Sequence, residues 1–299
     1  MASIVNTSRI AVVGLGQLGT SLAMKFKELG CREMLAVTRN EAALKQAVDD
    51  GILNAGSTDA EDILPVVDIV FLCTPLRPSI QFVKDNLQHF RFGSLVTDVS
   101  SVKAPIVEAI RPLLFQHGTW FIGSHPMAGS EKSGFDVGRA DLYEKAVTFI
   151  TPTEEDDTDA IRLLRQFWEA LGALPIEMTP ERHDQACAYS SHIGHLITAG
   201  LVKATLGQGD CEANAVACAT GFKDTTRIAS GNVNMWADIC RLNKGAISRA
   251  LTTFQDQMEH IKAAIEKEDW EAVSNFLQDG KSLRDTWMNT AGKDRGYTT

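Results

Sequence analysis

The chain has 299 residues, of which 44% are hydrophobic and 22% are charged, and it carries a formal net charge of −9 at pH 7. This is a globular composition with enough apolar material for two domains of ordinary size. The acidic balance argues against nucleic acid and anionic membranes as partners, because both require a cationic surface.

The N-terminal sequence and the cysteines bear on the compartment. No apolar run approaches the length of a membrane span, and the first eight residues lack the basic region and apolar core of a signal peptide. The six cysteines include no Cys-x-x-Cys pair, which is typical of reduced thiols rather than of disulfides or a cysteine-based metal site. We therefore expect a cytoplasmic protein with no membrane partner.

The first half of the sequence alternates short apolar strands with helical stretches. Strands are predicted at 9–14, 33–38, 68–73, 94–98, 119–123, 146–150 and 174–178. This alternation is typical of a parallel α/β sheet. Beyond residue 180 the pattern changes to long helical segments, predicted at 181–207, 211–229, 233–242, 244–267 and 270–288.

A glycine-rich turn follows the first predicted strand, in the order Gly-x-Gly-x-x-Gly, and leads into a helical run. Gly14 permits the tight turn, Gly16 lets the backbone approach a pyrophosphate, and Gly19 lets the helix pack close to the strand. The helix N-terminus offers N–H groups to the phosphates. The alternative is merely a sharp turn in an α/β fold. The residues predicted to bind a dinucleotide here are Gly14, Gly16, Gln17, Leu18 and Gly19.

The end of the second strand bears on which nicotinamide cofactor binds. An NAD-binding chain normally offers an acid there to the ribose hydroxyls, whereas this chain has Thr38 and Arg39. A hydroxyl and a guanidinium suit a 2′-phosphate, so we expect NADP, with NAD as the alternative if Arg39 is only a solvated residue. Thr74 and Pro75 end a later strand, where the nicotinamide half should pass.

The sequence therefore predicts an α/β fold with two parts. Residues 1–179 are expected to form a Rossmann-like dinucleotide-binding domain, and residues 180–299 an all-helical domain for substrate binding and dimerisation. Long helices rich in alanine, leucine and isoleucine often bury part of their surface against a second copy, so we expect a homodimer.

One histidine is presented where an apolar strand runs into a turn. His125 follows Trp120 to Gly123, and Pro126 stiffens the backbone behind it. Imidazole has an ordinary pKa near neutrality, so His125 is a candidate general base; the alternative is a hydrogen-bonded structural histidine. His192 and His195 could share a helix face, but no further ligand completes a set, so no metal is predicted.

Three motifs, in this order along the chain, closely resemble the TyrA family, the prephenate and arogenate dehydrogenases of tyrosine biosynthesis. They are Gly123-Ser-His-Pro-Met-Ala-Gly129, His183-Asp-Gln185 and Gly221-Phe-Lys-Asp-Thr-Thr-Arg227. The resemblance implies oxidative decarboxylation of a cyclohexadienol, a small-molecule substrate, with hydride transfer to a nicotinamide cofactor. Aromatisation of the ring supplies the driving force, so the protein mainly has to orient the substrate and polarise one hydroxyl.

The resemblance also implies the roles of site residues. His125 matches the catalytic histidine that takes the proton of the ring hydroxyl, and Ser101 matches a serine that hydrogen-bonds both groups. Arg227 matches an arginine that binds a substrate carboxylate. The other implied substrate-binding residues are His195, Ser191 and Glu131.

Structural alternatives stand beside these roles. Ser101 could cap a helix that begins near Val102, Arg227 could pair only with Asp224, and His183 could make only local contacts in the first long helix.

Two family substrates remain open. His195 favours prephenate, which carries a keto acid, while the Thr38–Arg39 pair resembles arogenate-using members. We expect conversion of prephenate to 4-hydroxyphenylpyruvate, with conversion of arogenate to tyrosine as the alternative. More distant alternatives are a β-hydroxyacid dehydrogenase, whose acid/base is usually a lysine in the helical region, and a non-catalytic dinucleotide-binding sensor.

Overall fold

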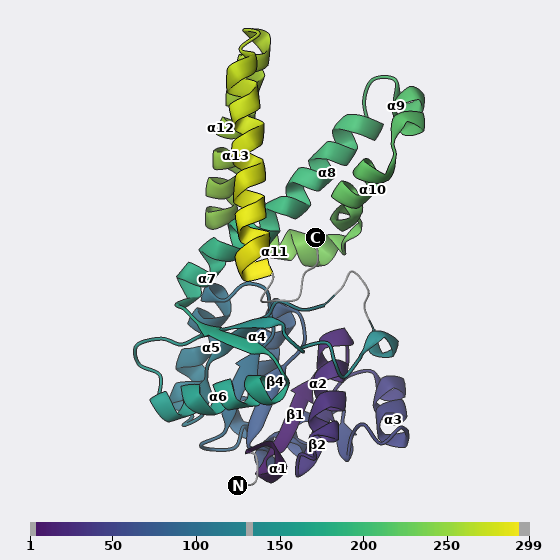
Figure 1. The fold of residues 1–299 in the computed structure, drawn as a ribbon. Coiled ribbons are helices and arrows are strands. Elements are labelled where there is room, and N and C mark those ends of the chain that lie inside the picture. The colour runs from purple at the N-terminus through teal and green to yellow at the C-terminus, as the bar shows by residue number, and fades with distance from the viewer. Residues whose placement is uncertain (1–3, 130–133, 293–299) are drawn as a thin grey trace.

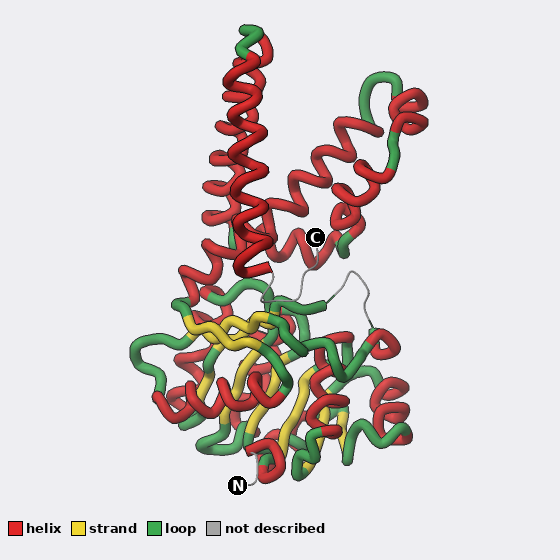
Figure 2. The backbone as a smooth tube through the Cα atoms, viewed as in Figure 1, coloured by secondary structure: helices red, strands yellow, loops and turns green. Residues whose placement is uncertain are grey.

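The computed structural model describes residues 4–129 and 134–292. The body of the molecule contains a sheet with helices on both of its faces, and two helical arms project from one side of it (Figures 1 and 2). None of the described helices has the length and apolar character needed to cross a membrane.

The body is built on a six-stranded parallel sheet with the strand order β3-β2-β1-β4-β5-β6. The order reverses between β1 and β4, so the crevice at their carboxyl ends is the expected place for a ligand. All four residues of β4 are buried, as expected for a strand covered on both faces. The strands are β1 Arg9–Val13, β2 Glu33–Val37, β3 Ala55–Ser57, β4 Ile69–Leu72, β5 Leu95–Asp98 and β6 Trp120–Phe121.

Two apolar cores cover the two faces of this sheet. In β1, Ile10 and Val12 join one core while Ala11 and Val13 join the other, because successive side chains of a strand point to opposite faces. Aromatic rings fill the first core, where Phe26 and Phe71 lie 5.3 Å apart between centroids. The helices of the body are α1 Ile4–Thr7, α2 Gln17–Glu28, α3 Glu41–Asp49, α4 Leu76–Asn86, α5 Ala104–Gln116 and α6 Thr158–Ala170.

A second, three-stranded sheet corrects the expectation of one parallel sheet. It has the order β7-β8-β9, in which β7 is antiparallel to β8 and β8 is parallel to β9. His125 therefore lies inside a short strand opposite Phe149, rather than in a turn. The reason is that the chain leaves the main sheet after β6 and pairs with β8 instead. The strands are β7 Gly123–Pro126, β8 Val147–Thr151 and β9 Leu174–Glu177.

From residue 180 onward the described chain is helical, as predicted. Thr179 caps the first of these helices by accepting a hydrogen bond from the Arg182 N–H, and Pro180 occupies a first-turn position that suits proline. Helices α12 and α13 form one arm, and α8 to α10 form the other (Figure 1). The elements are α7 Pro180–Cys187, a π-helical turn Ala188–His192, α8 Ile193–Leu206, α9 Cys211–Ala217, α10 Thr220–Thr226, α11 Val233–Leu242, α12 Lys244–Glu266 and α13 Trp270–Trp287.

Candidate active site

The glycine turn after β1 has the shape that a dinucleotide requires. Gly14 adopts a φ of +98°, in the left-handed region that favours glycine. A Cβ on Gly19 would lie 2.0 Å from the carbonyl oxygen of Gly14, so only glycine lets α2 pack this close. A Cβ on Gly16 would meet no atom within 4 Å, and no side chain caps α2 at this residue. The backbone next to the helix N-terminus is therefore open to a pyrophosphate, and the residues fit a dinucleotide.

The other predicted cofactor residues lie at the same edge of the sheet. A Cβ on Gly14 would lie 2.8 Å from Cγ2 of Thr74, so the end of β4 borders the glycine turn. Pro75 is the residue that precedes α4. Thr38 follows β2, where its N–H donates to Ser57 O at 3.2 Å, and Arg39 is exposed beside it.

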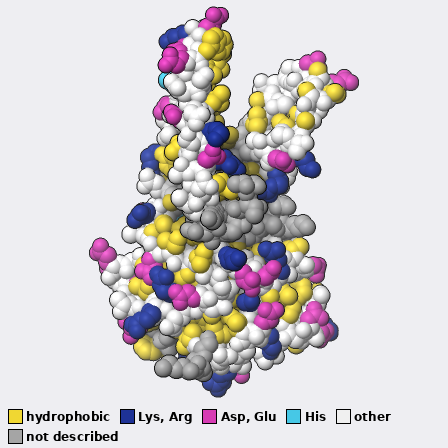
Figure 3. Space-filling model, viewed as in Figure 1, with side chains coloured by type: hydrophobic (Ala, Val, Ile, Leu, Met, Phe, Trp, Pro, Cys, Tyr) yellow, Lys and Arg dark blue, Asp and Glu magenta, His cyan; other side chains and the backbone are white. Residues whose placement is uncertain are grey.

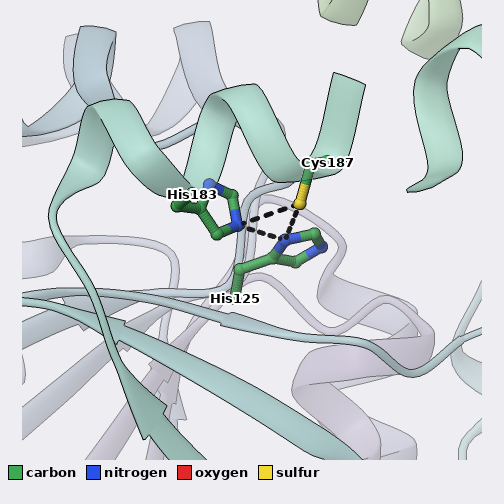
Figure 4. Close-up of side chains that lie close together, drawn as sticks. All are labelled: His125, His183 and Cys187. Carbon is green, nitrogen blue, oxygen red and sulfur yellow. Dashed lines mark hydrogen bonds between the residues drawn. The ribbon is translucent and has the colours of Figure 1, made fainter. Parts of the chain in front are cut away.

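Two buried histidines meet between β7 and α7. His125 Nδ1 lies 2.9 Å from His183 Nε2, although 58 residues separate them in the sequence. Cys187, one helical turn beyond His183, places its Sγ 3.3 Å from His183 Nε2 and 3.9 Å from His125 Nδ1. Figure 4 shows the three side chains pointing toward one another, with the second ring nitrogen of His125 directed away from the group. The expectation that His183 makes only local contacts is therefore wrong.

Asp184 links this pair to the start of α5. Its Oδ1 accepts hydrogen bonds from His183 Nδ1 at 2.8 Å and from the Lys103 N–H at 2.7 Å, and its Oδ2 accepts from the Ala104 N–H at 2.9 Å. A carboxylate from α7 thus supplies the acceptor that the first turn of α5 needs. Ser101 does not cap a helix near Val102, since α5 begins at Ala104 with Lys103 as its N-cap.

Lys103 is fully buried and ties the end of β5 to the strand that carries His125. Its Nζ donates to Asp98 Oδ2, and to the carbonyl oxygen of Ser124 at 2.8 Å. Asp98 also accepts from the Ser124 N–H at 3.2 Å. The Asp98–Lys103 ion pair therefore binds both the N–H and the carbonyl oxygen of Ser124, the residue that precedes His125. Burial lowers the pKa of Lys103, and the charge of Asp98 opposes that shift.

The electrostatics of the site favour neutral imidazoles. Burial holds the pKa of His125 well below its ordinary value, and the positive charges that His183, Lys103 and His192 carry when protonated lower it further. Burial also lowers the pKa of His183, and it lowers that of His192 to about 4. These three residues, the buried histidines of the site, are uncharged at pH 7 and can accept protons. Burial raises the pKa of Cys187 to about 12, so it is a thiol.

A second group of predicted residues lies on the helical side. The His195 ring stacks on Trp236 with 3.5 Å between centroids, and its Nδ1 lies 2.9 Å from the carbonyl oxygen of Ile228. Arg227 begins the short turn that contains this carbonyl, and its charge helps burial to lower the pKa of His195. The structure therefore brings His195 and Arg227 together. Arg227 itself is exposed.

The remaining predicted residues have simple placements. Ser101 is half-buried in the loop between β5 and α5, and Ser191 is half-buried in the π-helical turn. Glu131 lies outside the described residues. His192, whose ring was considered with that of His195, places its Nδ1 3.2 Å from Asn243 Nδ2.

Three residues that hold the site together, His183, Asp184 and Lys103, were not predicted as site residues, although His183 and Asp184 belong to a family motif. The available signals were a lysine five residues after the acid that ends a strand, and an adjacent His-Asp pair at a helix start behind Thr-Pro.

A metal is a weaker explanation of the His125 cluster than hydrogen bonding. Within the described chain, His125, His183 and Cys187 bring three possible ligand atoms within 4.8 Å of one another. The 2.9 Å between the two nitrogens is a hydrogen-bond distance. Two nitrogens bound tetrahedrally to zinc would lie about 3.3 Å apart.

Comparison with known proteins matches both parts of the chain to one family. The family described as "Prephenate dehydrogenase, nucleotide-binding domain" matches residues 22–177. That described as "Prephenate dehydrogenase, dimerization domain" matches residues 179–279. The prephenate dehydrogenase of Bacillus subtilis (strain 168) is 29% identical over 283 residues, which are 92% of this chain and 75% of that protein.

Solved structures that are similar to this chain carry the names of the same family. A crystal structure of prephenate dehydrogenase from A. aeolicus in complex with hydroxyphenyl propionate and NAD+ has a TM-score of 0.87 and 30% identity, covering 94% of this chain and 98% of that one. The Synechocystis arogenate dehydrogenase has a TM-score of 0.84 and 30% identity, covering 93% and 99% respectively.

Proposed function

The chain belongs to the TyrA family of prephenate dehydrogenases, and we propose that it oxidatively decarboxylates prephenate to 4-hydroxyphenylpyruvate in tyrosine biosynthesis. The observation that carries the proposal is the environment of His125, a buried imidazole whose Nδ1 lies 2.9 Å from His183 Nε2 and whose pKa burial lowers. Within the described chain its Nε2 has no hydrogen-bond partner. This base belongs to a chain whose glycine turn fits a dinucleotide.

The chemistry needs one proton acceptor and a carboxylate clamp. When bound, the nicotinamide accepts a hydride from the ring carbon that carries the hydroxyl. The proton of that hydroxyl passes to His125 Nε2, and Ser101 orients the hydroxyl. The ring carboxylate leaves as carbon dioxide, and the resulting phenolate oxygen takes the proton back from His125, so the base is regenerated within one turnover.

The substrate is held from the helical side in this proposal. The guanidinium of Arg227 binds a substrate carboxylate, for which its planar pair of donors is suited. His195 lies beside it with its ring fixed by Trp236 and the Ile228 carbonyl. Ser191 and Glu131 are proposed as further substrate contacts on the strength of the family resemblance.

Prephenate is preferred over arogenate because of His195. A histidine near the side-chain end of the substrate suits a keto acid, whereas the ammonium group of arogenate would call for an acid there. The related structures include dehydrogenases named for each substrate, so arogenate remains the alternative.

The reaction can be tested by the absorbance of the reduced nicotinamide, with prephenate and arogenate each combined with NAD and NADP. We expect turnover with prephenate, and the faster cofactor identifies the preference. Turnover with arogenate alone would identify arogenate, rather than prephenate, as the substrate. No turnover in any combination, with dinucleotide binding intact, would support the non-catalytic sensor.

NADP is the proposed cofactor because Thr38 and Arg39 follow β2 without an acid. Arg39→Ala should raise the KM for NADP by about tenfold or more and leave that for NAD unchanged, since only NADP has the 2′-phosphate. Arg32→Ala is the matched control, an exposed arginine immediately before β2, at the opposite end of that strand. Equal effects of Arg39→Ala on both cofactors would argue against this preference.

We also propose a homodimer formed by residues 180–299, with residues 1–179 as the dinucleotide-binding domain. Side chains of the two arms and of α11 that are large, apolar and more than two-fifths exposed favour a covering partner (Figure 3). These are Val216, Val233, Met235, Ile265, Trp270, Leu277, Leu283 and Trp287. The occupant is a second copy, because one matched family is described as a dimerization domain.

Light scattering after size exclusion should give twice the mass of one chain. The double variant Leu277→Lys, Leu283→Lys should give monomers, whereas Val48→Lys, which changes an exposed valine of α3, should not. If the natural protein is a monomer in this measurement, the proposed homodimer is wrong.

A cytoplasmic location stays a proposal, supported by six free cysteines.

A further inference from the structure

The hydrogen bonds around His125 run in one direction. Asp184 Oδ1 and Oδ2 accept from two backbone N–H groups at the start of α5, so this carboxylate acts as an acceptor. His183 Nδ1, 2.8 Å from Oδ1, must therefore carry a hydrogen that it donates. In a neutral imidazole the other nitrogen is then a bare acceptor. His183 Nε2 is that acceptor, and it faces His125 Nδ1 at 2.9 Å.

The direction of these bonds determines the protonation of His125. Two bare nitrogens cannot form a hydrogen bond, so the hydrogen between the rings sits on His125 Nδ1. The lone pair of His125 then lies on Nε2, the nitrogen that points away from His183 and Cys187 (Figure 4).

We propose that His183 and Asp184 are positioning residues that fix His125 in the tautomer with hydrogen on Nδ1, so that Nε2 is permanently the proton acceptor. This inference deepens the proposed function and rests on it for the identity of the proton transferred. A histidine base whose second nitrogen is held by a fixed acceptor keeps both its tautomer and its ring orientation.

The packing around His183 supports this role. Its ring is fully buried, and Phe149, which pairs with His125 in the sheet, lies 5.3 Å from it between centroids. Because Asp184 also accepts from the Lys103 and Ala104 N–H groups, the acceptor chain is anchored to the backbone of α5. The helical part of the chain thereby controls the base that the sheet-containing part carries.

Cys187 provides a matched comparison. It contacts both rings from the same helix, at 3.3 Å and 3.9 Å. Its thiol is a weak hydrogen-bonding group, so it is not expected to determine the tautomer.

The direct test is nuclear magnetic resonance of the full chain with ¹⁵N-labelled histidine. Two-bond ¹H–¹⁵N correlations distinguish protonated from bare ring nitrogens, and loss of one of the seven histidine spectra in His125→Asn assigns His125. We expect His125 protonated on Nδ1 at pH 7.5. Hydrogen on Nε2 in the unmodified protein would overturn the proposal. This readout needs no turnover, so it separates failure of the inference from failure of the proposed function.

Two substitutions of His183 test the same point by kinetics. In His183→Gln the amide oxygen can take the place of Nε2 and accept from His125 Nδ1, whereas His183→Leu offers no acceptor. We expect kcat within about threefold of the natural protein for the glutamine variant and at least about tenfold lower for leucine, because a wrong tautomer at a catalytic histidine costs up to about ten-thousandfold. The KM for the cofactor should not change.

The comparison remains decisive if one variant is unstable. Cys187→Ala should keep both kcat and the His125 tautomer, which shows that loss of packing alone is tolerated. If His183→Leu does not fold, the test is His183→Gln, which should keep hydrogen on His125 Nδ1 and keep kcat. Loss of either in a folded His183→Gln would overturn the proposal. Equal kcat in the leucine and glutamine variants, or an unchanged His125 spectrum in the leucine variant, would overturn the proposal.

Discussion

Two alanine substitutions in the glycine turn after β1 should affect cofactor binding and fold stability separately. A Cβ at position 16 meets no atom within 4 Å, and the φ of Gly16 is −88°, which alanine adopts without strain. A Cβ at position 19 would lie 2.0 Å from the Gly14 carbonyl oxygen. Gly16→Ala should therefore leave the fold intact, while Gly19→Ala should force α2 away from β1.

The magnitudes follow from these contacts. Gly16→Ala should change the free energy of unfolding by less than about 1 kcal/mol. It should weaken cofactor binding by about ten- to a hundredfold, because losing one hydrogen bond to a charged group costs about 1.5–3 kcal/mol. Gly19→Ala should cost at least about 3 kcal/mol, since overpacking here meets backbone atoms. That loss corresponds to a Tm lower by about 6–12 °C.

The assay pairs thermal unfolding by circular dichroism with titration calorimetry of NADP and NAD, on both variants and the natural protein. The result that would refute the reasoning is a Gly16→Ala variant with unchanged cofactor affinity. A Tm loss in Gly16→Ala equal to that in Gly19→Ala would refute it too, because it would mean that the space beside Gly16 is not open.

Three further results are expected. Lys103→Met should lower the free energy of unfolding, measured in urea, by about 3–5 kcal/mol, because Asp98 stays buried without its charge partner. Adding Asp98→Asn should recover part of this loss. No recovery would contradict the ion-pair account. Because burial lowers the pKa of all three buried histidines of the site, the unfolded chain binds more protons below pH 6.5. Unfolding free energy should be constant above about pH 7 and fall below pH 6.5 by up to about 1.4 kcal/mol per pH unit for each histidine, and a flat urea profile between pH 5 and 8 would be inconsistent with buried neutral imidazoles. Arg227→Ala should raise the substrate KM by about tenfold or more, with the exposed Lys203→Ala as control; an unchanged KM would return Arg227 to a structural role.

The short, partly exposed strand β3 was not predicted, whereas the other five strands of the main sheet were predictable because they are covered on both faces. Such strands appear as short, continuous apolar runs, and β4, with Ile-Val-Phe-Leu, is the clearest. Strand β7 was not predictable, since Gly-Ser-His-Pro has neither apolar alternation nor a good strand propensity. It is a strand because β8 pairs with it, and pairing between distant segments cannot be seen in local sequence.

The site was predictable only in part, for a similar reason. His125 stands out because it follows an apolar run and belongs to a family motif. The contact between His125 and His183 spans 58 residues and joins a strand to a helix. Helical periodicity shows that α7 has a buried face, but it cannot show which side chain that face meets. Lys103 was hidden for the opposite reason, because a lysine is almost never fully buried unless an acid pairs with it.

The central claim is that His125 accepts the hydroxyl proton while the ring carbon is oxidised. The most direct measurement is the single-turnover rate of His125→Asn with prephenate and the preferred cofactor, alongside cofactor affinity measured by calorimetry. Asparagine lacks the Nε2 position, so the rate should fall by about a hundredfold or more with cofactor affinity unchanged. A rate within about threefold of the natural protein would contradict the account and remove His125 from the role of base.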